Sequence, residues 1–96
     1  MLLEQKAQVL IEVGNSFEAV KTATTVVQLK PDWMFGYLTL ARAQLHFGDI
    51  NLALNSLQRA REIDPSNDEV IQEIVTVQRI LNIQNDMQDG RIIRLV

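Results

Sequence analysis

Residues that could perform chemistry are few and widely separated in this sequence. It contains one histidine, His46, and no cysteine, so a metal site built from imidazole and thiolate ligands is not expected. The acidic residue nearest to His46 in the sequence is Asp49, which is predicted to lie in a turn. The serines at 16, 56 and 66 have no base in sequence register. We therefore predict neither enzyme activity nor a cofactor.

Two other patterns have simple structural explanations. Glu69 and Glu73 are one helical turn apart, and carboxylates at this spacing on a surface helix are usually solvated. The four glycines are too scattered to form a phosphate-binding loop. Function is therefore expected to depend on a surface rather than on a catalytic centre.

Composition indicates one small globular domain. The 96 residues are 47% hydrophobic and carry a net charge of -3, which argues against a nucleic-acid partner. No apolar run approaches the roughly 20 residues of a membrane span, so a membrane partner is not expected. The N-terminus lacks the basic segment of a signal peptide, and the absence of cysteine suits a reducing compartment. An intracellular location is the resulting prediction, without a choice between cytoplasm and nucleus.

The sequence repeats itself with a period of 34 residues. This offset aligns identical residues, among them Ala7 with Ala41, Gly14 with Gly48, Ala19 with Ala53, and Pro31 with Pro65. A fixed period of roughly 20–50 residues is typical of solenoids, in which each unit is one supersecondary element. Such units build extended binding surfaces rather than enclosed pockets.

Turn residues divide the chain into helices. The two prolines follow helical patterns, and glycines at 14 and 48 fall midway between these stops. Apolar and small residues recur at helical spacing inside each segment. Five helices are predicted, over residues 2–13, 16–29, 33–47, 50–63 and 67–88. Asp49 and either Ser66 or Asn67 are the expected N-caps of the last two helices.

Residues 34–67 resemble a tetratricopeptide repeat. The resemblance rests on eight positions and on the turn Gly48-Asp49: Tyr37, Leu40, Ala41, Gln44, Ala53, Leu57, Ala60 and Pro65. Gln44 departs from the usual aromatic residue. Residues 1–33 match a second copy of the repeat less fully, with Lys6 where a leucine is expected. Residues 68–89 match the first helix of a third repeat.

The resemblance implies an all-α right-handed superhelix of antiparallel helix pairs, with about two and a half repeats. The helical domain would cover residues 1–89, and residues 90–96 would form an apolar tail. Arrays of this kind usually need about three repeats with polar capping ends. The chain is therefore expected to be part of a longer array, or to obtain the missing neighbour by self-association as a homo-oligomer.

In this family the first helix of each repeat lines a concave groove that binds a peptide or a helix of another protein. The resemblance assigns nine positions of this sequence to the groove: Glu4, Gln8, Phe35, Leu38, Arg42, Leu45, Glu69, Gln72 and Thr76. An aromatic residue next to an arginine is a reasonable composition for a binding hot spot. The alternative is a generic solvated face with scattered apolar residues.

Chaperone-binding members of the family hold a C-terminal carboxylate with a set of cationic and amide side chains. The matching positions here are Glu4, Gln8, Thr39 or Arg42, Gln72 and Thr76. Only Arg42 could contribute, because a glutamate and neutral residues would repel or ignore a carboxylate. A chaperone C-terminal carboxylate is therefore not expected as the ligand.

The predicted last helix carries an apolar stripe. Val70, Val77 and Leu81 would pack on a second helix of the third repeat, and that helix is missing. A stripe of this size needs a cover. Three alternatives remain: the apolar tail folds back over the stripe, a partner covers it, or a longer array continues from it. An assembly role through this stripe is the rival to a binding role for the groove.

Overall fold

The computed structural model of the protein describes residues 1–88. Its five α-helices are α1 (Leu2–Glu12), α2 (Ser16–Leu29), α3 (Met34–Phe47), α4 (Ile50–Ile63) and α5 (Asp68–Gln88). No strand occurs within these residues. The all-α class is confirmed, and every observed helix end lies within one residue of its prediction. The tail at 90–96, and with it the alternative of a fold-back over the last helix, lies outside the described residues.

The turns between paired helices depend on two glycines. Gly14 has a φ of 83° and Gly48 has a φ of 100°, a region that residues with a Cβ rarely adopt. The amide of Gly48 bonds to the carbonyl oxygens of Gln44 and Leu45, both at 3.1 Å, and so closes the end of α3. The repeat of glycine every 34 residues in the sequence is therefore a repeat of one turn conformation.

Asparagine side chains cap two of the helices. Asn15 accepts a hydrogen bond from an amide at the start of α2 at 3.4 Å, and Asn67 accepts one at the start of α5 at 3.1 Å. Asp49 is the N-cap residue of α4, as predicted, although its side chain makes no cap hydrogen bond. Of the two alternatives for α5, Asn67 is the cap, because the Ser66 hydroxyl donates to Asp64 Oδ1 instead.

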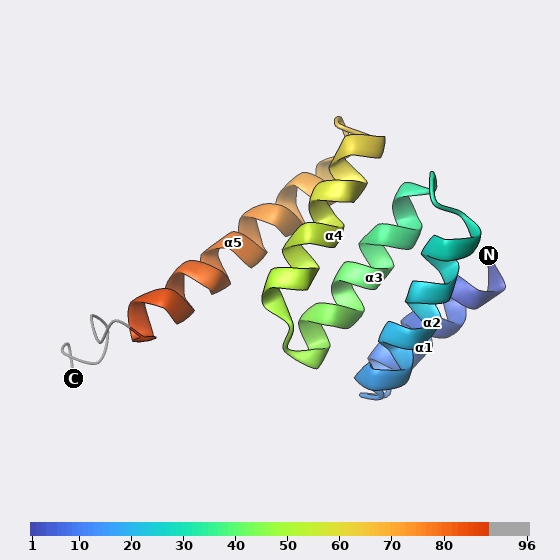
Figure 1. The fold of residues 1–96 in the computed structure, drawn as a ribbon, viewed down its shortest axis with the longest axis horizontal. Helices are drawn as coiled ribbons and strands as arrows, with labels where there is room; N and C mark the ends of the chain where they lie inside the picture. The colour runs from blue at the N-terminus through green and yellow to red at the C-terminus, as the bar shows by residue number, and fades with distance from the viewer. Residues whose placement is uncertain (89–96) are drawn as a thin grey trace.

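Consecutive helices lie side by side, with α3 between the α1–α2 pair and the α4–α5 pair (Figure 1). Close approach of the helices is allowed by alanines that are fully excluded from solvent: Ala7, Ala19, Ala23, Ala43, Ala53 and Ala60. Larger apolar residues fill the space between the second repeat and α5, where Leu38, Leu57 and Val70 belong to one buried cluster. The first repeat has a smaller buried cluster around Leu40.

Candidate functional site

The residues predicted to line a groove come from α1, α3 and α5, and we call their common surface the α1–α3–α5 face. Five of the nine are exposed: Gln8, Phe35, Glu69, Gln72 and Thr76. Arg42 and Leu45 are half-buried, whereas Glu4 and Leu38 are buried. Polar contacts join α1 to α3 and α3 to α5 across this surface. We call these two regions the α1–α3 junction and the α3–α5 junction.

Leu38 is not available to a partner, contrary to the prediction. Its side chain is 1% exposed and belongs to the core cluster that contains Leu57 and Val70. Full burial of a leucine is worth about 2 kcal/mol, which favours a place beneath the face rather than on it. Phe35, one turn earlier on α3, is 43% exposed and remains the aromatic residue that a partner could contact.

The α1–α3 junction is built around Glu4, which is only 7% exposed. Its Oε2 atom accepts a hydrogen bond from the Thr39 hydroxyl at 3.1 Å and another from the side-chain amide of Gln8. None of the ion pairs formed among residues 1–88 involves Glu4. The carboxylate is thus held by two neutral donors and lacks a cationic partner in the described part of the chain.

The α3–α5 junction is built around Arg42. Its Nη2 atom lies 3.1 Å from Oε1 of Glu69 and 3.2 Å from Oε1 of Glu73, and its Nε donates to the same Glu73 oxygen at 3.3 Å. The expectation that these two carboxylates are simply solvated is therefore wrong. Because Arg42 is already shared between two carboxylates, it is not a free cation for an anionic ligand.

The two junctions are related by the 34-residue repeat. Two residues of the first junction have equivalents in the second under this offset: Gln8 corresponds to Arg42, and Thr39 corresponds to Glu73. Glu4 corresponds instead to the core residue Leu38, and Glu69 corresponds to Phe35, which lies outside the first junction. Glu73 was missed as a groove residue, and Thr39 was named only as an alternative to Arg42 in the carboxylate-binding set. Each directly follows a position that the resemblance assigned to the groove, and their shared offset of 34 residues is the signal that could have found them.

The remaining predicted residues take no part in either junction. Phe35 packs against the ring of Trp33, with centroids 6.2 Å apart. Leu45 packs partly against the core. Thr76 donates its hydroxyl to the backbone carbonyl of Gln72 on its own helix at 3.1 Å. Gln72 and Thr76 therefore present exposed side chains on α5 without being fixed by α3.

The apolar stripe of α5 differs from the predicted one. Val70 and Val77 are 0% and 1% exposed and belong to the core shared with the preceding repeat. They are therefore already buried without a further helix. The exposed large apolar residues of α5 include Ile71 and Val75, at 37% and 42%, and Ile83 and Met87 toward its C-terminal end. The register of α5 explains the difference, because it places Val70 and Val77 inward and Ile71 and Val75 outward.

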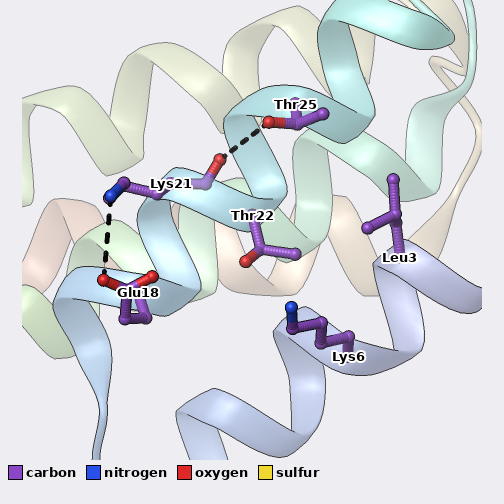
Figure 2. A pocket seen from close by; sticks show the side chains of 6 residues that line it. All are labelled: Leu3, Lys6, Glu18, Lys21, Thr22 and Thr25. Atoms are coloured by element: carbon purple, nitrogen blue, oxygen red, sulfur yellow. Dashed lines mark hydrogen bonds and ion pairs between the residues drawn. The ribbon is translucent and has the colours of Figure 1, made fainter.

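A surface hollow of about 250 Å³ lies between α1 and α2, away from both junctions (Figure 2). It is lined by Leu3, Lys6, Glu18, Lys21, Thr22 and Thr25. Lys6 stands where the repeat pattern expects a leucine, whereas the equivalent Leu40 of α3 is buried. A lysine that keeps its charge in water fills this space less completely. Lys21 lies 3.7 Å from Glu18, so one of the two lysines is already paired.

Potential metal ligands do not come together in the described part of the chain. Among residues 1–88, no group of three or more histidine, cysteine or acidic side chains is placed to hold a metal ion. His46 is exposed in the last turn of α3. Within the same residues, no helix combines the length and the apolar character needed to cross a membrane.

Comparison with known proteins gives relatives with the same kind of repeat. Tetratricopeptide repeat protein 33 of Xenopus laevis is 41% identical over 83 residues, which cover 86% of this chain and 32% of the relative. The Hsp70-Hsp90 organizing protein of Triticum aestivum is 32% identical over 68 residues, which cover 71% of this chain and 12% of that protein. The chain thus spans about a third or less of the length of these relatives. No protein-family model matches the sequence.

Among solved structures, the NMR structure of the first TPR domain of the human RPAP3 protein matches with a TM-score of 0.83. The match covers 88% of this chain and 67% of that chain at 18% sequence identity, a level at which it shows the fold alone. The predicted family is confirmed by the fold and the relatives together. The chain is a tetratricopeptide-repeat array that resembles part of tetratricopeptide repeat protein 33.

Proposed function

We propose that the protein is a non-catalytic interaction scaffold whose α1–α3–α5 face binds a peptide or helix of another protein. The observation that carries this proposal is the exposure of Phe35, an aromatic side chain that is 43% exposed on α3, the central helix of this face. Hydrogen bonds and ion pairs join α3 to α1 and to α5 on either side. Aromatic side chains dominate the energetics of many interfaces. Because both junctions already fix the face, little conformational entropy is lost when a partner binds.

The relatives support an interaction role in general terms. One of them is named an organizing protein for Hsp70 and Hsp90, and organising other proteins is an interaction function. The residues of this face argue against a C-terminal carboxylate as the ligand. Arg42 is shared between Glu69 and Glu73, and Glu4 presents a negative charge at the α1–α3 junction. A carboxylate at that place would meet repulsion instead of donors.

A pull-down from cell lysate with matched variants tests this proposal. The face variant combines Phe35→Asp with Gln72→Arg. The control combines Leu52→Asp with Gln58→Arg on α4, where Leu52 is 47% exposed. We expect partners to be retained by the wild type and the control and to be lost from the face variant, once circular dichroism shows equal helicity. Equal partner sets for the two variants would contradict the proposal.

An assembly role is the second candidate, and it is favoured by the exposed surface of α1. Leu2 and Val9 are 84% and 55% exposed. The residues one repeat later, Gly36 and Ala43, are buried. Two repeats later, the equivalent valines of α5 are buried as well. On α3 and α5, the surface equivalent to this part of α1 is covered by a preceding helix.

Sedimentation equilibrium of the wild type and of a variant with Leu2→Gln and Val9→Gln tests the assembly role. A self-associating element should form dimers that the variant abolishes. A monomer at all accessible concentrations would show that this surface does not join two copies of the chain.

A further inference from the structure

The Glu4 carboxylate has a surrounding that the proposed function alone does not explain. We propose that Glu4, Gln8, Phe35 and Thr39 form a subsite for the cationic side chain of a lysine or arginine in the bound protein segment. This inference rests on the proposed function, because it specifies the chemistry of the ligand at one point of the same face. The first support is that Glu4 has no cationic partner among residues 1–88. The second is the comparison of Gln8 with its equivalent one repeat later, Arg42.

Glu4 is a nearly buried carboxylate with an oxygen left over. Both of its hydrogen bonds end on Oε2. Among residues 1–88, no buried side-chain oxygen or nitrogen lacks a hydrogen-bond partner. The other oxygen, Oε1, receives no hydrogen bond from these residues, so it must remain in contact with solvent. Buried carboxylates are stabilised by cations or by several donors, and an incoming ammonium or guanidinium group would supply that interaction.

The chain itself shows how a cation is held between two such helices. At the α3–α5 junction, the guanidinium of Arg42 lies within 3.3 Å of carboxylate oxygens of Glu69 and Glu73. One repeat earlier, the position of Arg42 is taken by Gln8, which is neutral. The α1–α3 junction therefore has a carboxylate but no cation of its own. Charge complementarity assigns the missing cation to the partner.

Phe35 gives this subsite an apolar wall. It lies four residues before Thr39 on α3, so the two side chains share one side of the helix, and the Thr39 hydroxyl contacts Glu4. The exposed phenyl surface can hold the methylene groups of a lysine or the plane of an arginine while the charge approaches Oε1. An aromatic surface next to a carboxylate selects a cationic side chain over a neutral or an acidic one.

Selection from a library of random peptides, with the whole chain as bait, tests the subsite. The peptides that bind most tightly are synthesised, and their Kd values are measured by fluorescence anisotropy. The chain variants are Glu4→Gln in the subsite and Glu12→Gln as the matched control, which removes the same charge from an exposed position of the same helix. A third variant, Gln72→Trp, obstructs the α5 part of the face without changing charge and reports on the proposed function itself.

We expect the selected peptides to share a lysine or arginine and to be weakened by Gln72→Trp. Glu4→Gln should weaken them about tenfold or more, because the cation of the peptide loses a nearly buried carboxylate. Glu12→Gln should change Kd by less than about twofold, as exposed charges do. Replacing the basic residue of the peptide by methionine should raise the Kd for the wild type by the same factor as Glu4→Gln does. The same replacement should leave the Kd for the Glu4→Gln variant unchanged.

Two results would overturn the inference in distinguishable ways. If the peptides respond to Gln72→Trp but have no basic residue in common, or respond equally to Glu4→Gln and Glu12→Gln, the face binds proteins and the cationic subsite is wrong. If no selected peptide responds to Gln72→Trp, the proposed function fails and the subsite fails with it. Glutamine already occupies the equivalent position in α5, as Gln72, so Glu4→Gln is expected to fold. Replacing the basic residue of the peptide by methionine, measured with the wild-type chain, tests the cationic subsite without any substitution in the chain.

Discussion

At the α3–α5 junction a guanidinium lies between two carboxylates, whereas at the α1–α3 junction a carboxylate lies among neutral groups. The two junctions share two equivalent positions, Gln8 with Arg42 and Thr39 with Glu73, whereas Glu4 is equivalent to the core residue Leu38. The difference shows that the repeat fixes where side chains meet, while the residue types decide whether a junction satisfies its own charge. Arg42 completes its junction internally, and Glu4 leaves a negative charge that another molecule can use.

The largest expected effect comes from the position that Glu4 and Leu38 share in successive repeats. Leu38→Ala should lower the free energy of unfolding by about 2–5 kcal/mol, because it empties a fully buried part of the core. Phe35→Ala on the same helix should cost far less, since Phe35 is 43% exposed. Urea denaturation followed by circular dichroism measures both. Similar losses for the two variants would mean that Leu38 does not support the face from below.

An intermediate effect is expected from opening the internally paired junction. Arg42→Gln should lower the free energy of unfolding by about 1 kcal/mol, because Arg42 is partly exposed and its pairs are screened by water. Glu69 and Glu73 would then be left one turn apart without a cation. The loss should shrink as salt is added, which thermal melts at low and high ionic strength can measure. A loss that does not depend on salt would point to packing rather than charge.

The smallest effect is expected from removing the charge of the other junction. Glu4→Gln should change the free energy of unfolding by less than about 1 kcal/mol, because the carboxylate has no internal cation to lose. The same melts give this value. If Glu4→Gln lowered the free energy of unfolding as much as Arg42→Gln, Glu4 would have a mainly structural role rather than a role in binding a ligand. That result would weaken the comparison between the junctions.

Much of the fold could be predicted from the sequence, because glycine turns and small residues repeat at a fixed period. The turn glycines, for example, are tied to a positive φ that few other residues adopt. The contacts of the face were harder to predict. Leu38 was assigned to the surface by family resemblance, but an apolar side chain that can reach the core packs there. The contacts of Thr39 and Glu73 were not predicted, because they depend on the neighbouring helix and spacing within one helix does not reveal that neighbour.

The open charge at the α1–α3 junction can be tested without any partner. Gln8→Arg places a guanidinium where Arg42 stands one repeat later. In a double-mutant cycle with Glu4→Gln, measured by urea denaturation, we expect Gln8→Arg to raise the free energy of unfolding by about 1 kcal/mol only while Glu4 is present. A stabilisation that is equal with and without the Glu4 carboxylate would contradict the claim that this junction lacks a cation.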